Sequence, residues 1–189
     1  MQSIHKCAPV TLLILILTAL MSSPTQAHLM VAQHGTLNFV DDGAFMVLSL
    51  PISAFEGIDD DSDGKVSMIE FNNHRAAIVE SVGQNVTLSD IEGNLSLEGI
   101  MLSPVVGHDA SDESISQLTV MGRFALADAN GALRFQVGLF GKQSTGQLLK
   151  MTATRQSDKQ EHIFELTPVT PAGMLFADKA YSYEPVRTK

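Results

Sequence analysis

The sequence predicts a mainly β fold, an Ig-like two-sheet β-sandwich with an inserted helix-loop-helix segment, preceded by a cleavable signal peptide. Short runs rich in Val, Leu, Phe and Thr recur along the chain, bounded by Gly, Asp, Asn and Pro. Only residues 51–83 change to a helical periodicity. Many short strands with frequent turns favour a sandwich over a barrel.

The N-terminal region has the pattern of a secretory signal peptide. Lys6 precedes an apolar run from Val10 to Met21, and small and polar residues follow as far as Ala27. A bilayer-spanning helix needs about twenty apolar residues, so a retained membrane anchor is the weaker alternative. We therefore expect residues 1–27 to be removed and the protein to be exported, either periplasmic or extracellular, with no membrane span after cleavage.

The mature chain is expected to contain one domain, residues 28–167, without disulfides. Cys7 is the single cysteine and lies in the signal segment. Removing that segment also removes Lys6, so the formal charge of −9 becomes −10. This acidic balance disfavours nucleic acid as a partner because phosphates would be repelled. The domain must then depend on its hydrophobic core for stability.

The strands are predicted from local alternation and turn residues. A hairpin is expected where 36–40 and 44–50 flank Asp41, Asp42 and Gly43. Two further hairpins are predicted, one with strands 117–126 and 133–140 and the other with strands 148–154 and 162–167. A separate strand at 95–102 is expected to end at Ser103 and Pro104. Residues 168–189 lose periodicity and are predicted to form an extended C-terminal tail, which could cover a sheet edge.

The strongest chemical signal is the twelve-residue run DDDSDGKVSMIE at positions 59–70. Asp59, Asp61 and Asp63 occupy loop positions 1, 3 and 5, Gly64 stands at position 6, and Glu70 at position 12. Calcium takes six to eight oxygen ligands, and a loop winding around it turns alternate side chains inward. Glycine at position 6 allows the sharp reversal that such a loop requires.

These residues resemble the calcium-binding loop of the EF-hand family. The resemblance implies a calcium site made by Asp59, Asp61 and Asp63, with Lys65 contributing its backbone carbonyl, Ser67 acting through a water, and Glu70 supplying both carboxylate oxygens. A solvated acidic turn without an ion is the alternative. That alternative does not explain why Gly64, an apolar Val66 and Glu70 all fall in register.

The flanking residues predict the two helices of the motif. Pro51 can begin a short entering helix in which Ile52, Phe55 and Ile58 share one face. An exiting helix is expected to carry Phe71, Ile78, Val79 and Val82 on its apolar side and to stop at Gly83. No second loop matches, so Val66 at position 8 needs another partner. We expect a mainly structural ion that also supports a surface for an envelope or extracellular protein partner.

A copper-binding protein is the alternative function. Cleavage after Ala27 would give His28 a free α-amine beside its imidazole, and Met30, His34 and Met46 lie nearby in the sequence. In outline such a protein resembles the periplasmic copper-resistance family. The remaining histidines, His74, His108 and His162, are interpreted as surface or packing residues. We do not expect an enzyme, because no nucleophile elbow, zinc helix or phosphate-binding glycine loop is present.

Overall fold

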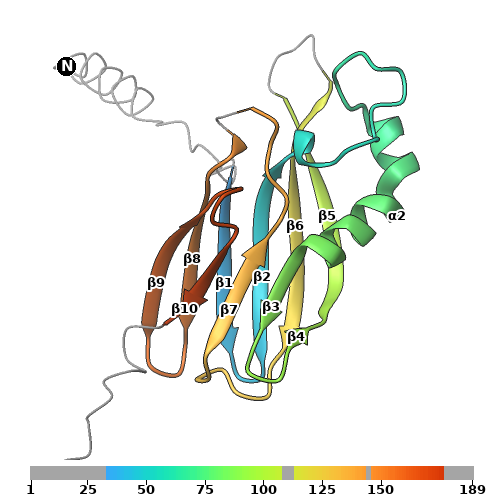
Figure 1. Ribbon diagram of the computed structural model, residues 1–189. Coiled ribbons are helices and arrows are strands. Elements are labelled where there is room, and N and C mark those ends of the chain that lie inside the picture. Colours follow the sequence, from blue (N-terminus) through green and yellow to red (C-terminus); the bar gives the residue numbers. More distant parts are fainter. Residues whose placement is uncertain (1–32, 108–112, 144–145, 177–189) are drawn as a thin grey trace, which may run out of the picture.

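The computed structural model describes residues 33–107, 113–143 and 146–176, and these form two facing β-sheets with a helix along one side (Figure 1). The predicted signal peptide, residues 1–27, lies outside the described residues, as do His28, Met30 and His108. The larger sheet has six strands in the order β5-β6-β2-β1-β8-β9, and the smaller has four in the order β10-β7-β3-β4. The predicted mainly β, two-sheet fold is confirmed, whereas the Ig-like layout stays a prediction.

The strands of the larger sheet are β1 (His34–Val40), β2 (Gly43–Pro51), β5 (Leu97–Val106), β6 (Ile115–Ala125), β8 (Leu149–Arg155) and β9 (Gln160–Leu166). Those of the smaller sheet are β3 (Val86–Ser89), β4 (Asn94–Leu95), β7 (Leu133–Val137) and β10 (Ala172–Leu175). A 3₁₀ turn, η1 (Ile52–Ala54), and the helix α2 (Met68–Asn85) lie between β2 and β3.

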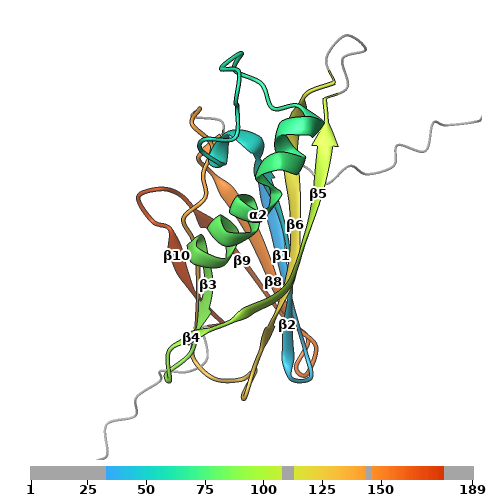
Figure 2. The same cartoon turned by 90° about the vertical axis from the view of Figure 1, so that its right-hand side faces the viewer.

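The core fills the space between the sheets. Successive side chains of a strand point to opposite faces, and the alternate residues of β1 are accordingly buried. Fully buried side chains from both sheets form one hydrophobic cluster, including Leu37, Phe39, Met46, Leu48, Leu118, Phe124, Leu88 and Phe135. Helix α2 adds Phe71, Ile78 and Val82 to this cluster. Figure 2 shows α2 running beside β3 of one sheet and β5 of the other.

Two of the predicted hairpins are confirmed. β1 and β2 pair antiparallel around Asp41, which has a φ of 50°. β8 and β9 also pair antiparallel, and Lys159 at their turn has a φ of 56°. The two hairpins are neighbours in the larger sheet, because β1 pairs with β8 in parallel.

The third predicted hairpin is wrong. Its strands exist, but β6 lies in the larger sheet between β5 and β2, whereas β7 lies in the smaller sheet between β10 and β3. The N–H of Leu126 still donates to the carbonyl of Asp42 at 2.8 Å, so the chain leaves the larger sheet only after β6 is complete. The turn residues at 128–131 indicate that the chain changes direction, but they do not say which sheet receives the next strand.

The entering helix is also wrong, since the chain makes only the single turn η1 before Phe55 returns to extended backbone. Pro51 does not begin a helix but ends β2, where it pairs with Gln117 of β6. Phe55 and Ile58 are nevertheless buried, with 5% and 4% of their surfaces exposed. Their three-residue spacing therefore reports burial on one side of an irregular segment rather than a helix.

Two predicted ends differ from the structure. The exiting helix is confirmed as α2, but it continues through Gly83 to Asn85. It ends because Val86, which is buried, begins β3. The strand predicted at 95–102 is interrupted at Ser96, and β5 then runs through Ser103 and Pro104 to Val106. Proline is tolerated there because β5 is an edge strand that need not donate a hydrogen bond on its outer side.

Part of the C-terminal segment belongs to the smaller sheet. β10 pairs antiparallel with β7, and the carbonyl of Pro171 accepts a hydrogen bond from the N–H of Val137 at 2.9 Å. Residues 172–175 thus form an edge strand within the predicted tail. In the part of the chain that the structure describes, no helix is both long and apolar enough to cross a membrane.

Candidate metal centre

The loop 59–67 is part of the connection between η1 and α2 and projects at the end of the sandwich where α2 begins (Figure 1). Asp59, Asp61 and Asp63 each present a carboxylate oxygen, and these oxygens all lie within 4.8 Å of one another. Three of the predicted ligands are thus brought together around a common point. Such a spacing suits a hard cation, which replaces the repulsion between the carboxylates by attraction.

Short-range hydrogen bonds hold this arrangement. The N–H of Gly64 donates to Asp59 Oδ2 at 3.0 Å, that of Asp63 to Asp61 Oδ1 at 3.1 Å, and that of Lys65 to Asp63 Oδ1 at 2.7 Å. Ser62 and Gly64 adopt positive φ values of 60° and 83°. The loop is therefore tightly wound by its own aspartates, and Gly64 takes the backbone conformation that the sequence predicted for position 6.

One oxygen in this cluster lacks a partner. Among the described residues, Asp59 Oδ1 is the buried side-chain polar atom without a hydrogen bond. A buried carboxylate oxygen without a donor is costly, so such an atom calls for an explanation. Because Asp59 stands at position 1 of the loop, a cation held among the three aspartates would satisfy this oxygen. The three aspartates therefore fit the predicted calcium ion.

Glu70 is not part of this group of three carboxylates, and it caps the helix that follows them. Its Oε2 accepts from the backbone N–H and the hydroxyl of Ser67, both at 2.8 Å, and its Oε1 accepts from the N–H of Asp60 at 2.9 Å. Ser67 in turn accepts from the N–H of Glu70, which completes a capping box at the start of α2. These hydrogen bonds, that from the Ser67 backbone most of all, lower the pKa of Glu70 to about 2.

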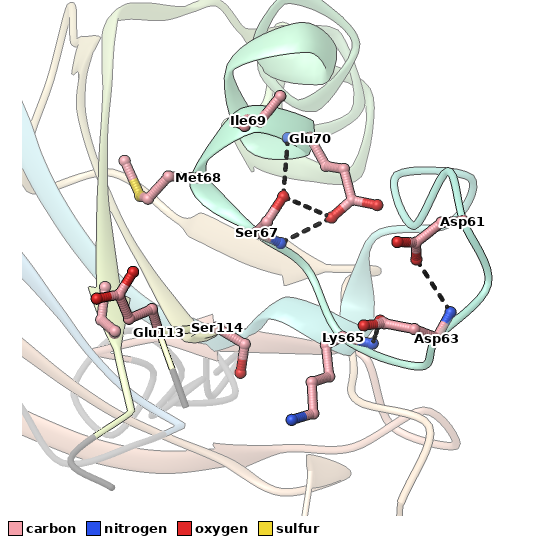
Figure 3. A pocket seen from close by; sticks show the side chains of 10 residues that line it. Asp61, Asp63, Lys65, Ser67, Met68, Ile69, Glu70, Glu113 and Ser114 are labelled. Atoms are coloured by element: carbon pink, nitrogen blue, oxygen red, sulfur yellow. Dashed lines mark hydrogen bonds between the residues drawn. The ribbon is translucent and has the colours of Figure 1, made fainter. Parts of the chain in front are cut away.

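Figure 3 shows how the predicted ligands are oriented. The carboxylate of Glu70 turns toward the loop on the side of Asp61, whereas the side chain of Lys65 extends away from both. That orientation agrees with the expectation that Lys65 contributes its backbone carbonyl alone. The hydroxyl of Ser67 is engaged by Glu70 and by the helix cap.

Three neighbours of the loop were missed by sequence reasoning. His74 Nε2 lies 2.7 Å from Asp60 Oδ1, and one signal for this contact was available, because His74 follows Glu70 by one helical turn. The N–H of Ile115 donates to the carbonyl of Val66 at 2.8 Å. Glu113 helps to line a pocket of about 610 Å³ beside the loop. Nothing in the sequence places Ile115 or Glu113 near residue 66.

The residues of the copper alternative are not brought together among those described. Met46 is 1% exposed and packs in the core, so it is unavailable to a surface ion. His34 begins β1, and His28 and Met30 lie outside the described residues.

No protein-family model matches the chain, and no curated protein is significantly similar to it. The resemblance to the EF-hand family accordingly rests on the sequence of about residues 51–83 and stays a prediction.

Proposed function

We propose that this protein binds one calcium ion in the loop 59–70 and that the ion mainly organises the structure of an exported domain. The observation that carries the proposal is the cluster of Asp59, Asp61 and Asp63 together with the unsatisfied Asp59 Oδ1. Asp59, Asp61, Asp63, the carbonyl of Lys65 and Glu70 would hold the ion, with Ser67 reached through a water. Calcium supplies positive charge that offsets the carboxylates.

A structural role is favoured over a sensor role by the surroundings of α2. Calcium sensors expose a hydrophobic groove by changing the angle between two helices. Here the chain enters the loop through η1 instead of an α-helix, and Phe71, Ile78 and Val82 of α2 are buried in the core. An ion would therefore fix a connection within the sandwich. A partner, if one binds, would meet the loop and the adjoining pocket.

Calorimetric titration of calcium into the metal-stripped protein lacking residues 1–27 tests the proposal. We expect one site in the wild type and much weaker binding in Glu70→Gln, which removes the charge at position 12. Glu80→Gln is the matched control, because Glu80 is an exposed carboxylate on the same helix and accepts one hydrogen bond from Gln84. Calcium binding by Glu70→Gln with wild-type affinity would refute the site assignment.

The same titration with copper separates the alternative function. Absence of calcium binding, combined with copper binding that His28→Ala abolishes, would replace the calcium proposal by the copper one. His28→Ala should leave calcium affinity unchanged if the calcium proposal is correct.

A further inference from the structure

We propose that strand β6 is the partner that Val66 needs in the absence of a second loop. The ion site and the end of the larger sheet where β6 begins would then stabilise each other. This inference rests on the proposed calcium site. Its basis is the hydrogen bond from the N–H of Ile115, the first residue of β6, to the carbonyl of Val66 at loop position 8. Val66 and Ile115 are both buried, with 6% and 2% of their surfaces exposed.

Three consecutive residues connect the ion site to the rest of the domain. Lys65 offers the carbonyl assigned to the ion, Val66 binds β6 through its own carbonyl, and Ser67 caps α2. The carbonyl assigned to the ion and the carbonyl bound to β6 therefore belong to two successive peptide groups, which are joined at the Cα of Val66. A shift of the backbone at Val66 would disturb both the assigned ligand and the hydrogen bond to Ile115.

β6 holds the other end of the same segment as well. Pro51, the last residue of β2, pairs with Gln117, which lies two positions after Ile115 on β6. The intervening residues 52–65, which include the three clustered aspartates, are thus closed into a loop whose two ends meet on one strand. Closure on a rigid strand reduces the conformations open to the loop, and this pre-organises the site.

The coupling extends from Ile115 to the neighbouring strand. Ile115 pairs with Val106 at the end of β5, and the N–H of Gly107 donates to the carbonyl of Ser114 at 3.0 Å. Coupling between two sites is reciprocal, so an ion that fixes Val66 must also stabilise this end of the β5–β6 pair.

Hydrogen exchange of the wild-type protein, with and without saturating calcium, tests the coupling at its own atoms. Calcium should slow exchange of the amide of Ile115 about ten-fold more than it slows exchange of the amide of Leu126, because only the hydrogen bond of Ile115 contacts the loop. The amide of Leu126 is the control, because it closes the opposite end of β6 by a single bond to Asp42 at 2.8 Å. Equal slowing of both amides would indicate global stabilisation only and would overturn the inference.

A pair of proline variants tests the reciprocal effect. Ile115→Pro removes the donor to Val66 and should weaken calcium binding about five-fold, the effect expected of one ordinary hydrogen bond. Leu126→Pro removes the donor at the far end of the strand and should leave calcium affinity unchanged. If Ile115→Pro does not fold, the exchange experiment on the wild type decides alone.

The outcomes distinguish the two proposals. If the wild type does not bind calcium, the proposed function is wrong and this inference falls with it. If the wild type binds calcium with unchanged relative protection at Ile115, or if folded Ile115→Pro keeps wild-type affinity, the inference is wrong and the calcium site stands.

Discussion

Replacing Gly64 by alanine isolates the contribution of backbone geometry to the proposed calcium loop. Gly64 has a φ of 83°, and a Cβ added there would meet no atom within 4 Å. The substitution therefore introduces no clash and removes no side-chain contact. Its whole effect comes from forcing a residue with a Cβ into the left-handed region.

The magnitude follows from that conformation. An alanine in the left-handed region costs about 1–2 kcal/mol relative to glycine. If the metal-free loop keeps its wound form, this cost appears as a lower free energy of unfolding without calcium. If the loop of the metal-free variant instead adopts a relaxed conformation, the ion must restore the wound form when it binds. The same free energy then weakens calcium affinity by about 5- to 30-fold. We expect the two losses together to amount to about 1–2 kcal/mol.

Calcium titration by calorimetry and urea unfolding in the presence of chelator measure the two losses separately. Gly57→Ala is the matched control, because Gly57 has a φ of 69°, faces equally open space and lies just before the loop. It should lower stability by a similar amount and leave calcium affinity unchanged. The reasoning fails if Gly57→Ala weakens calcium binding as much as Gly64→Ala does, or if Gly64→Ala changes neither quantity.

Three further predictions concern the stability of the domain. With an assumed dissociation constant near 10⁻⁴ M, calcium near 1 mM should raise the free energy of unfolding by about 1.4 kcal/mol and the melting midpoint by about 4 °C. A calorimetric scan measures both shifts, and chelator should reverse them. Gly141→Ala should lower the free energy of unfolding in urea by about 1–3 kcal/mol, because the added Cβ would lie 3.0 Å from the Cα of Gly146. The control Gly131→Ala should be nearly neutral, because a Cβ there meets nothing closer than 3.6 Å. The hydrogen bond from Arg155 lowers the pKa of Asp158 below its ordinary 3.8, so the stabilisation is present above that pH and is lost as the pH falls through the folded-state pKa. The stability advantage of the wild type over Asp158→Asn should therefore shrink in acid unfolding curves, and an advantage that grows toward low pH would contradict the assignment.

Features that depend on neighbouring residues could be predicted from the sequence. The wound backbone of the loop 59–67 is one of them, since each clustered aspartate accepts from an amide a few residues along the chain and Gly64 takes a positive φ. The turns at Asp41 and Lys159 are others, because they join strands that pair directly. The spacing of Ser67 and Glu70 also fits a capping box, which the structure contains, although both residues were interpreted only as ligands of the ion.

Features that depend on distant residues could not be predicted. Pro51 suits a helix start locally, but its pairing with Gln117 makes it the end of a strand. Pro104 suits a strand end locally, but the edge position of β5 allows the strand to continue. The partner of Val66 is Ile115, and no local pattern connects these residues. In each case a long-range backbone pairing overrides the preference of the local sequence.

The parallel pairing of β1 with β8 has a consequence for the order of folding. β1 lies between β2, which follows it at once, and β8, which begins only at Leu149. Until β8 pairs with β1, the backbone hydrogen-bonding groups along one edge of the first hairpin lack partners. The side chains of Leu37 and Phe39 on β1 are buried in the finished domain. Pairings between remote segments form slowly and leave such edges prone to aggregation. The chain is therefore most prone to aggregation after the β1–β2 hairpin has formed and before β8 pairs with β1. A chaperone would be most useful during that interval.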